Sequence, residues 1–250
     1  MGDDFPWLDE TERIEFPPVS QATREGIVAM GGNLSPGVLL SAYSQGIFPW
    51  FSENEPILWW SPDPRFVLFP ANIHISKSMR KLLSQERYTT TFDADFERAI
   101  TECSTMERPG QNGTWITDGM ISSYIELHER GYAHSIEVWE GETLAGGLYG
   151  VSLGSCFFGE SMFSRLPNSS KAALAVLCTA LVRAEFDVVD CQVYTPHLET
   201  MGAELIPREQ FLAHLQIGLQ SPTLRGDWGV WFNGLKGEDV LAMKKRRDGT

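Results

Sequence analysis

The sequence predicts an α+β fold in which a mixed, mostly antiparallel sheet is flanked by helices and follows a small N-terminal domain. The first observation is a change of character along the chain, because residues 1–66 are rich in Pro, Gly and Trp and regular periodicities begin after them. The second is a run of strand patterns followed by a buried helix and one more strand, over residues 134–193. We therefore expect an N-terminal α/β domain over 1–66 and a larger domain over 67–250.

One helix is expected in the N-terminal domain. Ser35 can serve as its N-cap and Pro36 as its first residue, and Gly46 is suited to the position just after its end. The apolar side of this helix is supplied by Leu39, Leu40, Ala42 and Tyr43.

The larger domain begins with two strands and three helices. These are a strand near 66–69, a helix opening at Ser76, a Thr-rich strand over 88–92, and helices over 93–103 and 118–130. Three strands follow, over 134–139, 143–151 and 155–163, and their short connections contain Gly141 and Gly154. Strands joined by such turn-like connections favour an antiparallel meander.

The pattern then changes to a helix that is apolar almost all round, over 171–186, with Ser169 or Ser170 as its N-cap. A short core strand over 188–193 follows it. This order of elements resembles the N-acyltransferase (GNAT-type) superfold.

Composition excludes several classes of protein. The 20 Lys and Arg against 33 Asp and Glu give a formal charge of −13, which excludes a polycation that coats nucleic acid. With 42% hydrophobic and 21% charged residues the chain is an ordinary globule, and disorder as its main state is excluded. The only basic cluster at an end is 244–247, which we interpret as a frayed, solvated tail.

Cysteine and histidine spacing gives no sign of a metal site. The four cysteines show no C-x-x-C pair and the five histidines no ligand spacing, so we expect reduced thiols and no metal. The first residues lack a targeting pattern, and the charge-free run 26–52 is broken by glycines and prolines. We therefore expect a cytoplasmic protein with no membrane segment.

Aromatic residues gather in segments with little regular structure. Trp50, Trp59 and Trp60 lie close together in the N-terminal domain, and Trp115 precedes a helix start. Indoles held on loops are suitable for stacking on nucleobases. The alternative is that they pack the interface between the domains, which composition alone favours.

A basic stripe lies on the helix that opens at Ser76. Lys77, Arg80 and Lys81 are three and four residues apart and therefore share one face. Such a stripe on an acidic protein can hold phosphates. Taken alone, an ordinary solvated face is the simpler interpretation.

Polar residues interrupt two core strands. Alternation predicts that Phe158, Glu160 and Met162 share one strand face, which surrounds a carboxylate with apolar groups. Asp190 and Gln192 share a face in the same way. Because buried polar groups need partners, these side chains either satisfy a buried network or line a cleft. Gly146, Gly147 and Gly150 would let a ligand approach the preceding strand, or mark a bulge.

Taken together, these segments resemble the leucyl/phenylalanyl-tRNA–protein transferase family. The runs that carry the resemblance are 29–36, 46–51, 56–65, 74–76, 113–117, 134–139, 159–164 and 190–192, and their joint order is specific. The resemblance implies a cytoplasmic monomer that moves Leu or Phe, and also Met, from aminoacyl-tRNA to proteins with N-terminal Arg or Lys. It further implies that this transfer marks the acceptor for degradation by the N-end rule, with no cofactor and no metal.

The resemblance also implies roles for individual residues. Trp50 and Trp115 would stack on the terminal adenosine of the tRNA, and the face with Lys77, Arg80 and Lys81 would meet the acceptor stem. The catalytic centre would hold Glu160, Asp190 and Gln192. The amino-acid pocket would be lined by Leu148, Phe157, Met162, Leu174, Leu177, Leu181 and Val189.

The chemistry implied is aminolysis of an ester, which runs downhill to an amide without ATP. An α-amino group with a pKa of about 7.7 to 8.0 is already partly neutral at pH 7, so positioning matters more than a strong base. We hypothesise that Asp190 accepts a hydrogen bond or proton from the acceptor amine and that Gln192 orients the reacting groups. Glu160 would fix the donor α-ammonium or the ribose hydroxyls.

Two alternatives belong to other classes. An acyl-CoA-dependent N-acyltransferase would need a glycine-rich loop before the buried helix to hold pyrophosphate, but residues 165–170 contain no glycine. A non-catalytic module that binds RNA or peptide would not need Asp190 for its function.

Overall fold

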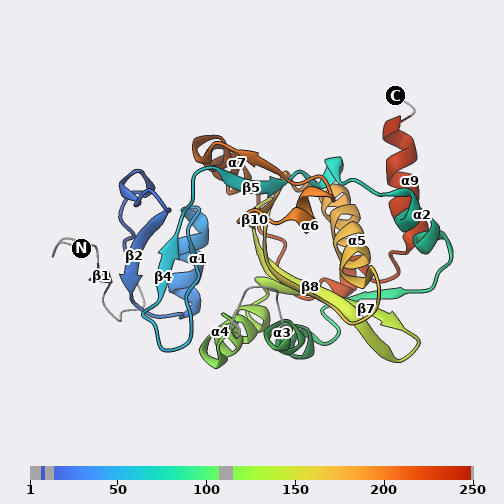
Figure 1. The fold of residues 1–250 in the computed structure, drawn as a ribbon, viewed down its shortest axis with the longest axis horizontal. Coiled ribbons are helices and arrows are strands. Elements are labelled where there is room, and N and C mark those ends of the chain that lie inside the picture. Colours follow the sequence, from blue (N-terminus) through green and yellow to red (C-terminus); the bar gives the residue numbers. More distant parts are fainter. Residues whose placement is uncertain (1–6, 9–13, 107–114, 249–250) are drawn as a thin grey trace.

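The computed structural model describes residues 7–8, 14–106 and 115–248 (Figure 1). The N-terminal part is a small sheet with strand order β1-β2-β4-β3. Its elements are β1 (Trp7–Leu8), the 3-10 turn η1 (Val19–Gln21), β2 (Ile27–Gly31), helix α1 (Pro36–Ser44), β3 (Phe48–Pro49) and β4 (Leu58–Trp60).

Helix α1 begins and ends as its capping residues predict. Ser35 occupies the N-cap position and Pro36 the first turn, although the Ser35 side chain makes no capping hydrogen bond. Gly46 follows the helix with φ = 73°, in the left-handed region that glycine adopts at low cost. Val38, Leu39 and other apolar residues of α1 are buried, so the helix closes one face of the small sheet.

The larger sheet has seven strands in the order β11-β5-β10-β9-β8-β7-β6. Their bounds are β5 (Arg65–Leu68), β6 (Thr89–Phe92), β7 (Ala133–Glu140), β8 (Thr143–Leu153), β9 (Cys156–Ser164), β10 (Val188–Gln192) and β11 (Glu204–Ile206). Every neighbouring pair described in this sheet is antiparallel except β9 and β10. The prediction of a mostly antiparallel sheet with helices around it is confirmed.

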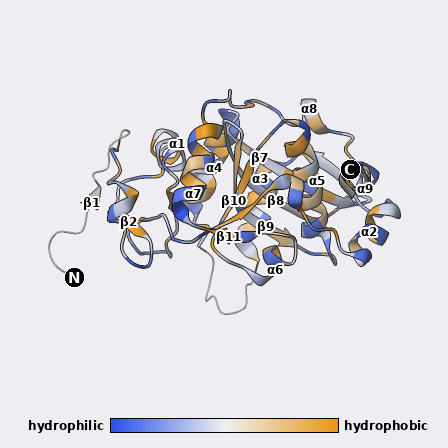
Figure 2. Cartoon of the chain, turned by 90° about the horizontal axis from the view of Figure 1, so that it is seen from above, coloured by the Kyte–Doolittle hydropathy of each residue, from blue (hydrophilic) through white to orange (hydrophobic). Residues whose placement is uncertain are grey.

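Helices cover both faces of the larger sheet. The apolar residues of α3 (Phe96–Thr105) and α4 (Asp118–Glu129) pack on one face, and those of α5 (Ser169–Arg183) pack on the other (Figure 1). Figure 2 shows hydrophobic residues concentrated along the strands of the larger sheet, as expected of a sheet covered on both sides. The remaining elements are η2 (Pro70–Asn72), α2 (Lys77–Ser84), α6 (Pro196–Glu199), α7 (Arg208–Gly218), α8 (Gly229–Phe232) and α9 (Gly237–Asp248).

Helix α5 starts earlier than predicted. Asn168, with φ = 65°, is the residue before the helix, so the assignment of Ser169 or Ser170 as N-cap is wrong. The Ser169 hydroxyl donates instead to the carbonyl of Ala145 at 2.7 Å. A Cβ on Gly146 would lie 2.2 Å from this hydroxyl oxygen, so the glycine lets the start of α5 approach the sheet.

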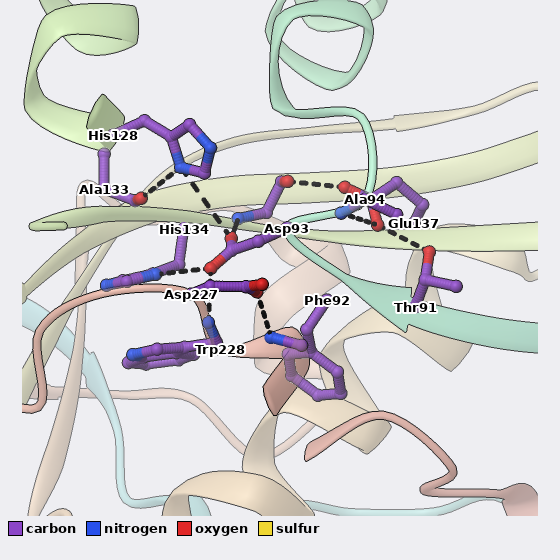
Figure 3. A network of polar contacts seen from close by, with 12 residues as sticks. Thr91, Phe92, Asp93, Ala94, His128, Ala133, His134, Glu137, Asp227 and Trp228 are labelled. Carbon is purple, nitrogen blue, oxygen red and sulfur yellow. Dashed lines mark hydrogen bonds and ion pairs between the residues drawn. The ribbon is translucent and has the colours of Figure 1, made fainter. Parts of the chain in front are cut away.

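The C-terminal segment is held against the edge of the sheet. Asp93, in the turn after β6, accepts hydrogen bonds from the backbone N–H groups of Ser135 and Trp228, both at 2.8 Å, and contacts His134 Nδ1 at 2.8 Å (Figure 3). The His134 ring stacks on the Trp228 ring. Beyond this anchor the chain forms α9 through Asp248, so the expectation of a frayed tail over 244–247 is wrong for the backbone.

Candidate functional site

The parallel strands β9 and β10 separate along their length. They pair as far as Asp190 opposite Phe158, after which β9 continues to Ser164 without β10 beside it. Gln192, with φ = 64°, turns the chain away from the strand direction. A cavity of about 580 Å³ lies at these separated ends, lined from both strands, from α5 and from the N-terminal domain.

Most of the predicted amino-acid pocket lines this cavity. The residues that do so are Leu148, Phe157, Met162, Leu174, Leu177 and Val189. Leu181, one turn further along α5, is fully buried in the core and does not line the cavity. The apolar wall therefore comes from β8, β9, β10 and one side of α5, and it is suited to an apolar side chain.

Two of the tryptophans reach the cavity. Trp50 and Trp115 are half-buried and line it from the N-terminal domain and from the segment before α4. Trp59, by contrast, is fully buried, so the packing interpretation holds for that residue. Trp60 Nε1 donates to the Trp50 carbonyl at 2.7 Å and thereby helps to fix the Trp50 backbone. Residues 113–114 lie outside the described residues.

A β-bulge places Glu160 at the cavity. Tyr149 pairs with Ser161 and the next residue of β8 pairs with Gly159, so Glu160 is the extra residue of β9. The bulge breaks the strand alternation: Phe158 packs in the core on the side of α1 and α4, whereas Met162 packs on the side of α5. The prediction that Phe158, Glu160 and Met162 share one face is therefore wrong.

The Glu160 carboxylate lies at the centre of a buried hydrogen-bond network. Tyr43 of α1 donates to Oε1 at 2.7 Å, Tyr124 of α4 donates to Oε2 at 2.9 Å, and Gln192 Nε2 donates to Oε1 at 2.8 Å. The two tyrosine hydroxyls also contact each other. The network joins α1 of the N-terminal domain to α4, β9 and β10 of the larger domain at one carboxylate.

Burial makes this carboxylate hard to ionise. It raises the pKa of Glu160 from its ordinary 4.5 to about 7, against the hydrogen bonds from Tyr43, Tyr124 and Gln192, which lower that pKa. Glu160 therefore changes charge near neutral pH.

Asp190 lies behind the cavity wall. Its side chain is fully buried and accepts hydrogen bonds from Arg65 Nε at 2.8 Å and from Arg65 Nη2 at 2.7 Å. Its Oδ1 also accepts the backbone N–H of Gln192 at 2.9 Å. Gln192 lines the cavity, whereas Asp190 does not. The structure thus separates two residues that the strand pattern placed on one face.

Comparisons with known proteins identify the family. The family model described as leucyl/phenylalanyl-tRNA protein transferase matches residues 67–216, and the model of its N-terminal domain matches residues 32–63. The chain belongs to this family. A leucyl/phenylalanyl-tRNA–protein transferase of Syntrophus aciditrophicus is 58% identical over 217 residues, covering 87% of this chain and 91% of its own.

Two further relatives with the same name agree with this. The protein of Desulforapulum autotrophicum is 50% identical, covering 90% of this chain and 98% of its own, and that of Myxococcus xanthus is 52% identical, covering 91% and 94%. The family recognised from the sequence motifs is confirmed, and with it the assignment of an aminoacyl-tRNA-dependent aminoacyltransferase. The acyl-CoA-dependent alternative and the non-catalytic module are set aside.

The basic residues of this transferase lie apart from the cavity. Lys77 and Lys81 are exposed on α2, and the partly buried Arg80 donates from Nε to the Ile75 carbonyl at 3.2 Å. None of the three lines the cavity. The Ser76 side chain caps α2 by accepting the Met79 N–H at 3.2 Å, so the start of this helix is confirmed.

Sequence reasoning missed several residues of the site. Tyr43 was assigned only to the apolar side of its helix, and Tyr124 and Arg65 were given no role. Cys191 and His197 also line the cavity. A phenol on an otherwise apolar helix face is the one signal that the sequence offered, because a buried hydroxyl needs a partner.

Two further observations concern the described part of the chain. No group of three or more His, Cys, Asp or Glu side chains lies there in an arrangement that could hold a metal ion. Within the same residues, every helix is too short or too polar to span a bilayer.

Proposed function

We propose that this transferase moves Leu or Phe, and also Met, from aminoacyl-tRNA to proteins that begin with Arg or Lys, and that the product is degraded by the N-end rule. The observation that carries the proposal is one cavity on which an apolar wall, two indoles and a network around one carboxylate all converge. The relatives named above are leucyl/phenylalanyl-tRNA–protein transferases. We further propose a cytoplasmic monomer that uses no cofactor or metal.

We further propose a division into a small N-terminal domain over residues 1–66 and a GNAT-type domain over 67–250. Strand β5, the first strand of the larger sheet in chain order, starts two residues before this boundary, at Arg65. The parallel strands β9 and β10, connected through α5, separate at the cavity as expected of an acyl-transfer site between two strands.

The donor would occupy the cavity. Its Leu or Phe side chain would contact the apolar wall, and its terminal adenine would stack on Trp50 and Trp115. A branch at Cβ would place a methyl group close to the strand backbone, so Ile and Val esters should be poor donors.

The acceptor amine would then attack the ester carbonyl. A C–N bond forms, the bond from the carbonyl carbon to the ribose oxygen breaks, and that oxygen takes a proton as the amine loses one. Ionised Glu160 would hold the donor α-ammonium or the ribose hydroxyls, while Gln192 orients the reacting groups. The negative charge of the whole chain favours a cationic acceptor.

The function is tested with labelled Leu-tRNA and three peptides that differ only in a first residue of Arg, Lys or Ala. We expect label on the Arg and Lys peptides and little on the Ala peptide. Label on none of the peptides, with Leu-tRNA intact, would overturn the proposal. Val-tRNA in place of Leu-tRNA tests the shape of the pocket in the same assay.

The basic face of α2 gives a salt-dependence prediction. If Lys77 and Lys81 contact tRNA phosphates, the double variant Lys77→Gln/Lys81→Gln should reduce the slope of log KM for Leu-tRNA against log salt by about 1 to 2, because each contact releases roughly one counterion. The matched control is Arg24→Gln/Arg98→Gln, which removes two exposed positive charges elsewhere. Equal slopes for the two double variants would count against the assignment.

A further inference from the structure

Arg65 is a fully buried arginine whose side chain reaches the back of the site. Its guanidinium forms a two-pronged ion pair with Asp190, in which both side chains have 0% exposure. Arg65 of β5 therefore neutralises the Asp190 carboxylate of β10 in a place that water does not reach. Such a pair is retained at a cost of desolvation, and breaking it leaves a buried charge without compensation.

Two aromatic rings hold the guanidinium in place. Arg65 Cζ lies 4.7 Å from the centre of the Phe48 ring and 4.7 Å from that of the Phe211 ring. Phe48 belongs to β3 of the N-terminal sheet and lines the cavity two residues before Trp50, whereas Phe211 belongs to α7. Rings at this distance attract a cation and limit its movement. Arg65 therefore connects the N-terminal sheet and α7 to the strand that carries Asp190.

The Asp190 carboxylate accepts three hydrogen bonds within the protein and does not line the cavity. Arg65 occupies both oxygens, and Oδ1 also accepts the Gln192 N–H. The hydrogen bond from the Gln192 N–H to Asp190 holds Gln192 in its left-handed conformation, which residues other than glycine rarely adopt. In this conformation Gln192 Nε2 reaches Glu160 Oε1 at 2.8 Å.

We propose that Arg65 is a positioning residue for the transfer reaction. It fixes Asp190, Asp190 fixes the backbone of Gln192, and Gln192 presents its amide to Glu160 at the cavity wall. Asp190 then acts by holding Gln192, and the proton that the acceptor amine loses is balanced by the proton that the departing ribose oxygen takes up. This inference rests on the proposed function, and it adds Arg65 to the residues on which that function depends.

The test is a double-mutant cycle between Arg65→Lys and Gln192→Ala. Lysine keeps the charge but cannot make the two-pronged contact. We expect Arg65→Lys to lower kcat by at least 10-fold in the wild-type background, with KM for Leu-tRNA changed by less than 3-fold. In the Gln192→Ala background the same change should cost less than 2-fold, because the residue that Arg65 positions is already absent. An equal loss in both backgrounds would overturn the proposal.

Two measurements separate positioning from a general loss of folded protein. Rates are divided by the concentration of sites that bind Leu-tRNA, so unfolded molecules do not count. Asp190→Asn should lower kcat while keeping the wild-type slope on the acid side of the pH profile, whereas a slope reduced by one would show that Asp190 itself accepts the proton and would overturn the proposal.

If Arg65→Lys does not fold, Phe211→Leu takes its place in the cycle. Phe211→Leu keeps the ion pair of Arg65 with Asp190 but removes one of the two aromatic rings that contact the guanidinium. A smaller loss that disappears in the Gln192→Ala background supports the proposal, and an additive loss overturns it. Transfer by the wild-type protein from Leu-tRNA to the Arg peptide is measured first. Its absence would refute the proposed function itself, so the two failures can be told apart.

Discussion

Glu160→Gln should lower kcat/KM for leucine transfer by about 10- to 100-fold at pH 8. The substitution keeps the size of the side chain but removes the negative charge at the centre of the network formed with Tyr43, Tyr124 and Gln192. Hydrogen bonds to a charged group contribute roughly 1.5 to 3 kcal/mol, which sets the size of the effect. The measurement is initial-rate transfer from Leu-tRNA to an Arg peptide across pH 5.5 to about 8.5.

The pH dependence separates the carboxylate from the acceptor amine. Because burial raises the pKa of Glu160 to about 7, the ionised form accumulates only above that pH. The acceptor amine also becomes reactive as pH rises, so wild-type log kcat/KM should climb with a slope that approaches 2 on the acid side. The Glu160→Gln slope should approach 1, since only the amine still titrates.

The free energy of unfolding should fall as pH rises, whereas the transfer rate should increase. Glu160 binds a proton more tightly in the folded state, with a pKa of about 7 against an ordinary 4.5, so its contribution to stability falls as pH rises from 4.5 to 7. The fall amounts to about 3 kcal/mol for a shift of this size. Chemical unfolding of wild type and Glu160→Gln at pH 5 and pH 8 measures it, and the variant should lack this part of the change.

Tyr43→Phe and Tyr124→Phe are the matched controls. Each removes one hydroxyl from the network but keeps the carboxylate, so each should retain the two-ionisation pH profile with a smaller loss of rate. A Glu160→Gln enzyme with the wild-type slope would show that Glu160 does not titrate in the reaction, and the assignment of its role would fail.

Local patterns were sufficient to predict most elements of the larger domain. Capping residues and turn glycines predicted the helix at Ser76 and the strands that became β7, β8 and β9, because their signals lie within the element itself. The short strands β1 to β4 and β11 were not predicted. Strands of two or three residues, such as β1, β3 and β11, carry too few alternations for a pattern, and their pairing partners supply the missing information.

The polar centre of the site needed contacts that no local pattern contains. The bulge at Glu160 changes which side of the sheet the following residues face, and it depends on the register between β8 and β9. Asp190 is 125 residues from Arg65 along the chain, so strand alternation could place the carboxylate inward but could not supply its partner. The family resemblance, in contrast, indicated ten residues that do line the cavity.

Replacing both Trp50 and Trp115 by alanine should raise KM for Leu-tRNA by about 100-fold or more. Both indoles line the cavity, and stacking on a base contributes roughly 1 to 3 kcal/mol for each aromatic ring. At saturating donor, kcat should change by only a few fold, because Glu160 and Gln192 are untouched. Each single variant should lie between wild type and the double variant.

Trp231→Ala is the matched control, since this indole is 61% exposed and does not line the cavity. It should leave KM unchanged. A second comparison uses leucyl-adenosine and leucine methyl ester as short donors. If the indoles hold the adenine, wild type prefers the adenosine ester and the double alanine variant loses that preference. A preference that survives in the double variant would place the adenine elsewhere, and the cavity would then bind only the amino acid.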